Sequence, residues 1–370
     1  MSKEEKGDNM LCAYNDHQEL VQADYQLNRD QKYFCPSCRQ RVYLKKGALM
    51  IPHFAHFKSC SQFAFSEGET VEHLQGKRVL AEWFSQLGAK SIEMEAYLPK
   101  LQQRPDVLVE LDASSKIAVE FQCSPISAQK LSKRSLGYLM VDYFPLWIFG
   151  RRYRNKKISP TVQAGMFQDR GEITCAFLKN KTLILVKNIQ QLGYPHQIKF
   201  QALHYPLNKL SFDGGGHLLP AKIVNGGSEW HKEEDIHLFL QRQSYYKSAN
   251  YRPFFQMLYE QGEAVLTLPR EILQPLEKEW RLKVNPFQLR FALLKKVEAL
   301  PFGSIFSTQE LLRQLPSGLL NSYRAPQLSN PQLNVAQDFL NRLEKSGVVS
   351  SVGASYWQYE RRAKRPQAPL

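Results

Sequence analysis

The alternation of apolar and polar positions between residues 66 and 149 predicts two helices and four strands. Ser66 and Glu69 have the spacing of a capping box, and the helix that they open extends to about Leu87. Alternating or continuous apolar runs then predict strands, and a helical repeat separates the last two. These elements are strands at Ile92–Leu98, Pro105–Leu111 and Lys116–Cys123, a helix at Ser127–Met140 and a strand at Tyr143–Phe149. The order αβββαβ predicts an α/β fold, a mixed sheet flanked by helices.

The patterns on either side of this region differ from it. Residues 1–64 combine short alternating runs with a group of cysteines and histidines, which predicts a small β-rich module. Residues 158–284 contain strand-like runs at Thr182–Val186 and Gln197–Leu203 and a glycine-rich turn at residues 214–216, from which no role follows. We therefore predict four parts, at residues 1–64, 65–157, 158–284 and 285–370.

The last of these parts is mostly helical, and its order of elements is that of a winged helix-turn-helix domain. Three helices precede a two-stranded hairpin, and the basic residues lie on the third helix and beyond the hairpin, where DNA contacts are common. A small helical docking domain is the alternative, and a transcription regulator is a third and weaker possibility. The helices are Phe287–Leu300, Gln309–Leu315 and Leu333–Lys345, with a β-like run at Ser304–Ser307 and hairpin strands at Val348–Val352 and Ser355–Tyr359. The candidate DNA contacts are Arg342, Lys345, Arg361 and Arg362.

The composition of the chain indicates a polyanionic partner. The 370 residues carry a formal net charge of +14, and the isoelectric point is about 9.4. Such a charge attracts and holds phosphates, which favours nucleic acid over a membrane. No apolar run approaches the roughly 18 residues of a membrane-spanning helix, and residues 1–9 do not resemble a secretory signal. Six cysteines in so long a chain do not indicate a disulfide scaffold, so we expect a cytoplasmic protein.

One basic stretch follows the predicted α/β core directly. Arg151, Arg152, Arg154 and Lys156 surround Tyr153. Cationic side chains around a tyrosine can follow a phosphate backbone and stack a base. A solvated linker is the more common explanation of such a run.

The cysteines and histidines of residues 1–64 have the spacing of a zinc site. Cys35 and Cys38 form a Cys-x-x-Cys pair, and His53 and His56 follow at close to the usual zinc-finger distance. The histidine spacing is one residue shorter than usual, so Cys60 competes for the fourth position. We predict Cys35, Cys38, His53 and His56 as the ligands. Four protein ligands leave no open position for water, so this zinc would be structural.

Acidic residues on two neighbouring predicted strands suggest a second metal site. Asp106 and Glu120 lie on either side of a predicted turn, so their side chains can meet and hold Mg²⁺ or Mn²⁺ beside a phosphodiester. Gln122 projects to the same face of its strand as Glu120, because strand side chains alternate. It can position a water molecule but cannot supply the charge of a lysine.

The first predicted helix contributes polar residues to the same region. Leu80, Phe84 and Leu87 form an apolar stripe, and helical steps towards the N-terminus continue it through three polar residues. Polar groups on a core-facing stripe need a polar site to face. These three residues are Lys77, His73 and Glu69. Glu69, or alternatively Glu72, would be a further metal ligand. His73 and Lys77 would contact phosphate or transfer protons. On the second predicted helix, Arg134 and Tyr138 face either this site or solvent.

With these residues in place, the chain resembles the competence protein CoiA family. The resemblance rests on the Cys35-x-x-Cys38 and His53-Phe-Ala-His56 module, on Glu72-His73-x-x-x-Lys77, and on Arg104-Pro-Asp106 with Glu120-Phe-Gln122-x-Ser124-x-Ile126-Ser127. The central part is similar to the PD-(D/E)xK superfamily, which has the restriction-endonuclease fold. The superfamily's metal ligands correspond to Asp106 and Glu120, but Gln122 replaces its usual lysine. Water activation is therefore weaker, borrowed from Lys77, or absent.

The resemblance implies a cytoplasmic protein that acts on incoming DNA during transformation and recombination. We expect an Mg²⁺- or Mn²⁺-dependent deoxyribonuclease, together with recombination proteins as partners. The alternative is a DNA-binding recombination accessory factor that has lost turnover, and Gln122 favours it.

Overall fold

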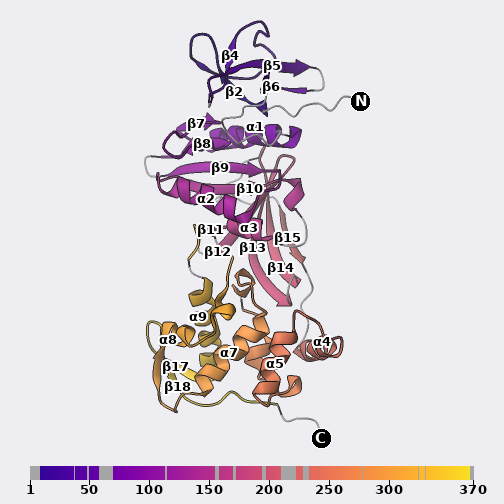
Figure 1. Ribbon diagram of the computed structural model, residues 1–370, viewed down its shortest axis with the longest axis vertical. Coiled ribbons are helices and arrows are strands. Elements are labelled where there is room, and N and C mark those ends of the chain that lie inside the picture. The colour runs from indigo at the N-terminus through magenta and orange to yellow at the C-terminus, as the bar shows by residue number, and fades with distance from the viewer. Residues whose placement is uncertain are drawn as a thin grey trace.

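The computed structural model describes most of the chain in three consecutive parts. It describes residues 9–36, 38–47, 50–57, 70–112, 115–154, 158–169, 172–193, 197–209, 222–227, 233–276, 278–323, 325–329 and 331–366. The parts follow one another along the long axis: a β module, a central α/β sheet and a helical region (Figure 1). Within the described residues, no helix has the length and hydropathy that a membrane crossing requires.

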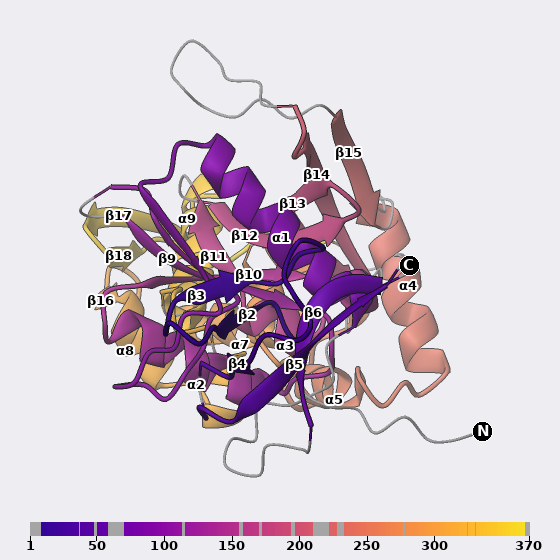
Figure 2. The same cartoon turned by 90° about the horizontal axis from the view of Figure 1, so that it is seen from above.

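The N-terminal module is a six-stranded sheet, as its alternating pattern predicted. Its strand order is β1-β6-β5-β4-β2-β3, and the small core includes Tyr33, Val42 and Phe54. Viewed from above, the module lies over the central part (Figure 2). The strands are β1 (Asn9–Met10), β2 (Cys12–Tyr14), β3 (Leu20–Gln22), β4 (Tyr33–Phe34), β5 (Arg41–Gly47) and β6 (Met50–His56).

The central part has the predicted αβββαβ order. The elements are α1 (Val71–Gln86), β7 (Ser91–Met94), β8 (Val107–Glu110), β9 (Lys116–Gln122), α2 (Ala128–Leu139) and β10 (Phe144–Phe149). Strands β7, β8 and β9 are antiparallel, and β10 runs parallel to β9. The predicted helix at Ser127–Met140 is confirmed, because Ser127 is the N-cap of α2 and accepts a hydrogen bond from the Lys130 amide.

The two faces of this sheet are covered by different helices (Figure 1). Val119 and Phe121 of β9 pack on the face of α1, whereas Ala118 packs on the face of α2 beside Tyr138. Helix α1 approaches β9 closely at Gly76, where a Cβ atom would lie only 2.0 Å from the ring of Phe121. A glycine inside a helix costs roughly 1 kcal/mol relative to alanine, and here it sets the distance between α1 and the sheet.

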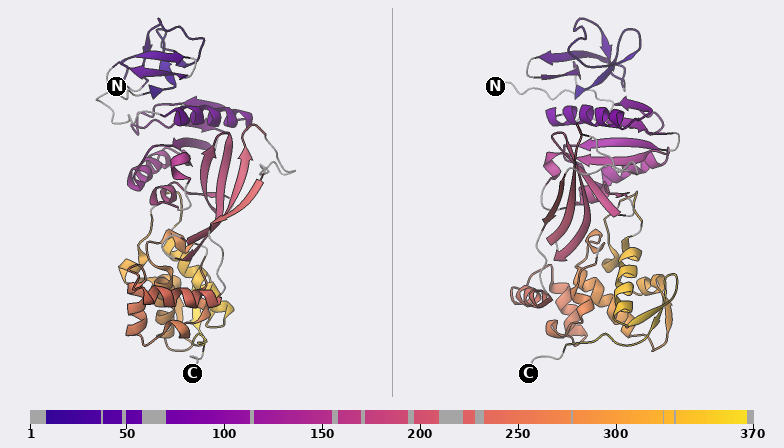
Figure 3. Two further views of the ribbon diagram at one scale, coloured as in Figure 1. Left: turned by 90° about the vertical axis from the view of Figure 1, so that its right-hand side faces the viewer. Right: turned by 180° about the vertical axis from the view of Figure 1, so that it is seen from behind.

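The central sheet continues beyond residue 157, where the sequence placed the end of the α/β part. Strand β12 pairs with β10, so one nine-stranded sheet includes the region to which no role had been assigned. Its long outer strands curve towards the helical region (Figure 3). The additional elements are α3 (Pro160–Ala164), β11 (Phe167–Asp169), β12 (Glu172–Lys179), β13 (Thr182–Gly193), β14 (Gln197–Pro206) and β15 (Lys222–Gly227). The predicted turn at residues 214–216 lies outside the described residues.

The helical region has one continuous core that begins before the predicted boundary at residue 284. Ile236 and Leu240, far upstream of that boundary, pack in the same cluster as Phe287 and Trp357. The order predicted for residues 285–370 is confirmed, including a hairpin that pairs with a third strand in the order β16-β18-β17. The elements are α4 (Glu233–Tyr245), α5 (Arg252–Glu260), α6 (Arg270–Leu273), α7 (Pro286–Glu298), β16 (Ile305–Ser307), α8 (Thr308–Arg313), α9 (Pro331–Lys345), β17 (Val349–Gly353) and β18 (Tyr356–Tyr359), with 3₁₀ turns at Val265–Thr267, Glu279–Arg281 and Ser317–Leu320.

Candidate functional site

The first helix begins later than the sequence predicted. Thr70, with an extended backbone, is the N-cap of α1, and its side chain accepts a hydrogen bond from the His73 amide. Ser66 is therefore not the N-cap of this helix. Glu69, which the sequence placed on the apolar stripe, lies outside the described residues. Of the predicted stripe, His73 and Lys77 are on the helix.

Asp106 is held between α1 and β9. Its Oδ2 lies 3.1 Å from His73 Nε2 and accepts a hydrogen bond of 2.7 Å from the Phe121 amide. Burial alone would raise the pKa of Asp106, but the charge and hydrogen bond of His73 more than offset it and hold the pKa well below its usual range. Asp106 is therefore an anion at neutral pH.

Glu120 is held from the other face of the sheet by α2. Its Oε1 accepts hydrogen bonds from Arg134 and from the Tyr138 hydroxyl, and Arg134 also binds the backbone oxygen of Arg104 at 3.1 Å. Arg134 and Tyr138 thus face the candidate site, one of the two positions that the sequence allowed. Burial raises the pKa of Glu120, Arg134 opposes that rise, and the charge of Asp106 adds to it.

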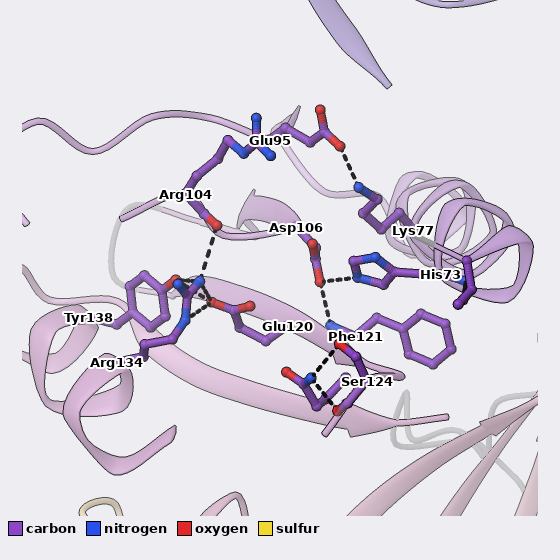
Figure 4. Close-up of polar contacts among 12 residues, drawn as sticks. His73, Lys77, Glu95, Arg104, Asp106, Glu120, Phe121, Ser124, Arg134 and Tyr138 are labelled. Carbon is purple, nitrogen blue, oxygen red and sulfur yellow. Dashed lines mark hydrogen bonds and ion pairs between the residues drawn. The ribbon is translucent and has the colours of Figure 1, made fainter. Parts of the chain in front are cut away.

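The register places the two carboxylates opposite each other. Val107 pairs with Val119, so Asp106, one residue before β8, stands across from Glu120. Figure 4 shows both at the same end of the strand pair. The contacts described above converge on Asp106 Oδ2 and Glu120 Oε1, and none of them involves Oδ1 of Asp106 or Oε2 of Glu120. Carboxylate oxygens that remain available at a partly exposed strand end match the ligand preference of Mg²⁺.

Gln122, at the position to which the resemblance assigns a lysine, is fixed by its own chain. The side-chain nitrogen Nε2 of Gln122 donates to the Ser124 carbonyl at 2.7 Å and lies 3.3 Å from Ser124 Oγ. Lys77 does not replace the lysine: it is fully buried, and its ammonium group binds Glu95. Its charge helps to lower the pKa of Asp106, but its burial does not support the predicted contact with phosphate or transfer of protons.

Glu95 was not singled out from the sequence. It lies at the end of β7 with a φ of 55°, is 2% exposed, and accepts hydrogen bonds from the backbone amides of Leu11 (3.0 Å) and Cys12 (3.2 Å) of the N-terminal module. The Lys77 ammonium group holds its pKa below the usual value against the opposing effect of burial. A signal existed, because a lysine on the core-facing stripe of a helix requires a buried acidic partner.

Three of the four predicted zinc ligands come together. Cys35, Cys38 and His56 place one ligand atom each within 4.8 Å of one another, and Cys38 Sγ lies 3.2 Å from His56 Nε2. The group is therefore compact enough to hold a metal ion. His53 is outside it and contacts the Ile51 carbonyl at 2.8 Å through Nδ1.

His53 is separated from the group because both histidines lie on one strand. Residues three apart on a strand project from opposite faces, and His53 and His56 both lie on β6. The sequence prediction had assumed that both histidines reach one ion. Cys60, the rival fourth ligand, lies outside the described residues.

The basic stretch after β10 is a 3₁₀ turn at Arg151–Tyr153. Arg151 and Arg152 are exposed, Arg154 is partly buried, and Lys156 lies outside the described residues. Tyr153 is 9% exposed, and its hydroxyl donates to Ser124 O at 2.8 Å. Little of the Tyr153 ring is therefore accessible for stacking a base, one of the two possibilities that the sequence left open.

The basic candidates of the helical region have different surroundings. Arg342 donates to the carbonyls of Glu271, Gln274 and Pro275 at the end of α6, and burial lowers its pKa to about 10. Arg361 donates to the carbonyls of Ser346 and Gly347 after α9. These two arginines are engaged within the fold, whereas Lys345 and Arg362 are exposed.

Comparisons with known proteins cover nearly the whole chain. The model described as the nuclease-like domain of competence protein CoiA matches residues 69–214, and the N-terminal and C-terminal domain models match 16–63 and 228–368. Competence protein CoiA of Bacillus subtilis (strain 168) is 27% identical over 269 residues, which are 70% of this chain and 69% of the Bacillus protein. No solved structure matches the chain significantly.

Proposed function

The chain belongs to the competence protein CoiA family, and from this premise we propose that it is a cytoplasmic, metal-dependent deoxyribonuclease that acts on incoming DNA. Asp106 and Glu120 would bind Mg²⁺ or Mn²⁺, and Cys35, Cys38 and His56 would bind a structural zinc ion. The assignment of the central sheet to the restriction-endonuclease fold, and of residues 285–370 to a winged helix, belongs to the same proposal. Recombination proteins are the proposed partners.

One observation carries this proposal: two carboxylates stand opposite each other at one end of an antiparallel strand pair. A divalent cation bound there would polarise the scissile phosphate and lower the pKa of a bound water molecule. His73 keeps Asp106 ionised, Arg134 orients Glu120, and the Gln122 side chain at the same strand end would orient the attacking water.

The proposal is tested by DNA cleavage in Mg²⁺ or Mn²⁺. We expect the double variant Asp106→Asn, Glu120→Gln to lose at least about 1,000-fold in rate, which corresponds to roughly 4 kcal/mol of activation free energy. Both substitutions keep the size of the side chain. Glu93→Gln with Asp142→Asn, the same two substitutions at exposed positions, is the matched control. Cleavage that persists in the double variant would refute the assignment.

A second candidate function, a DNA-binding recombination factor without turnover, is favoured by two observations. Gln122 replaces a lysine, and the Oε1 atom of Glu120 already accepts hydrogen bonds from Arg134 and Tyr138. This alternative predicts salt-sensitive DNA binding and no cleavage with any divalent ion. The same assay separates the two functions.

A further inference from the structure

One face of the N-terminal sheet carries a row of aromatic side chains. Tyr14 of β2 is the register partner of Phe34 of β4, and Phe34 is the partner of Arg41 of β5. Tyr43 lies two residues beyond Arg41 and therefore projects to the same face. Phe57, which directly follows β6, completes the row, because its ring centroid lies 4.7 Å from that of Tyr43. The row thus crosses four neighbouring strands.

The aromatic row is not part of the core of the module. The core lies on the opposite face of the sheet, which carries Val42 and Phe54. Phe57 is 61% exposed, and the other three rings of the row are partly exposed. The attachment to the central part uses Ile51, near the start of β6, which packs in the buried cluster with Leu74 of α1. The rings at the other end of the face therefore remain accessible to a ligand.

Cationic side chains stand among these rings. The guanidinium carbon of Arg39 lies 4.2 Å from the centroid of the Tyr14 ring. The charged groups of Arg41 and Lys45 lie 5.9 and 5.4 Å from the centroids of two further rings of the row. None of the described strand residues of the module is acidic, because its described acidic residues lie in the connections between strands. The face therefore attracts anions.

Rings and cations interleaved in this way suit a nucleic acid with unpaired bases. Bases stack on aromatic rings, and arginine and lysine contact the phosphates beside them. In sheets that bind RNA, aromatic residues on neighbouring strands stack two or three bases. A duplex presents its phosphates but keeps the faces of its bases inside its own stack. It can therefore use the cations of this face but not the rings.

We propose that this face of the N-terminal module binds a single strand of nucleic acid, with bases on the aromatic row and phosphates on Arg39, Arg41 and Lys45. The proposal goes beyond the proposed cleavage, and neither requires the other. The face would hold a strand whether or not Asp106 and Glu120 cut it.

The test uses the full chain carrying Asp106→Asn and Glu120→Gln, so that binding is measured without cleavage. The probes are three fluorescein-labelled oligonucleotides of about 16 nucleotides: a single strand, its blunt duplex, and a strand of equal length that lacks the bases. Phe57→Ala removes a ring of the row. Tyr259→Ala, which removes an 87% exposed ring from α5, is the control. An unchanged urea midpoint shows that each variant is folded.

We expect Phe57→Ala to weaken binding of the single strand about tenfold, the loss of one stacked base. Binding of the duplex and of the strand without bases should not change, and Tyr259→Ala should bind all three probes as the parent chain does. Phe57→Leu should behave like the alanine variant and Phe57→Tyr like the parent, because leucine fills the space but has no aromatic face. Full affinity of the leucine variant, or an equal loss on the strand without bases, would overturn the proposal.

Arg41→Glu tests the cations of the same face. It should weaken binding of both single-stranded probes and reduce the slope of log K against log salt by about 0.7, the value of one phosphate contact, between about 50 and 200 mM salt. Arg252→Glu makes the same change at an exposed position in the first turn of α5 and should leave affinity and slope nearly unchanged. Equal effects of the two substitutions would count against the proposal.

The outcome is separable from that of the proposed function. If Phe57 controls binding but the wild-type chain does not cleave, the stacking face stands and the nuclease assignment fails. If cleavage depends on Asp106 and Glu120 but Phe57→Ala binds the single strand like Tyr259→Ala, the reverse holds.

Discussion

Figure 4 shows two clusters of acidic and basic side chains, one at Lys77 and Glu95 and one at Asp106 and Glu120, and they differ in how deeply they are buried. In one, the side chains of Lys77 and Glu95 are 0% and 1% exposed, and Glu95 also accepts two backbone amides of the N-terminal module. In the other, the side chains of Asp106 and Glu120 are 14% and 8% exposed, and each bears an oxygen that the contacts described above do not use.

The difference separates a structural role from a chemical one. Breaking a buried ion pair leaves an uncompensated charge, so the Lys77–Glu95 pair holds the module on α1 and leaves no room for a ligand. Asp106 and Glu120 are oriented by protein groups but not enclosed by them. Buried carboxylates thus hold the module in one cluster, whereas in the other they have the exposure that the proposed metal binding requires.

Removing Lys77 should have the largest effect on stability. Lys77→Met leaves Glu95 buried without its cation, so we expect a loss of about 3–5 kcal/mol in the free energy of unfolding, measured by urea denaturation. Lys90→Met, at an exposed position, should change it by less than about 0.5 kcal/mol. Adding Glu95→Leu to Lys77→Met should recover part of the loss, but not all, because the Leu11 and Cys12 amides lose their acceptor. A loss below about 1 kcal/mol in the single variant would contradict this role.

The zinc group extends the comparison to a third cluster. His56→Asn should weaken zinc binding by more than the 10–100-fold typical of outer-shell partners, because a direct ligand is lost. His53→Asn should leave the zinc content unchanged, because His53 lies outside the group. Metal analysis after dialysis against a weak competing chelator measures both. Equal zinc loss in the two variants would restore the ligand set that the sequence predicted.

The pattern of apolar positions predicted most elements because local periodicity determines them. The helix from Ser127, the strands around Asp106 and Glu120 and the hairpin ending at Tyr359 all follow from it. Which strands pair with one another was not predictable in the same way. The pairing of β12 with β10, which joins residues 158–227 to the central sheet, depends on contacts distant in sequence.

The site was predicted in part for the same reason. Asp106, Glu120 and His73 were correctly placed near one another, because strand register and helix periodicity are local rules. Lys77 was on the correct helix, but the Glu95 that binds it comes from the end of another strand. The prediction that both histidines bind one ion was wrong because it used their spacing alone. The strand on which they lie places His53 and His56 on opposite faces.

Arg134 offers the smallest and most specific test, because its expected effect is a shift in the pH at which the site works. Burial raises the pKa of Glu120 and Arg134 lowers it, so Arg134→Met should raise this pKa further. Metal binding requires the ionised carboxylate, and the acidic limb of cleavage against pH should therefore move to higher pH, above the ordinary glutamate value of 4.5. Asp106, whose pKa is lowered, is already ionised there and should not set this limb. Lys133→Met, at an exposed neighbouring position, should leave the profile unchanged. A limb that stays in place or moves to lower pH would show that Glu120 does not bind the catalytic metal. Asp106 would then be the one remaining candidate metal ligand of the two carboxylates.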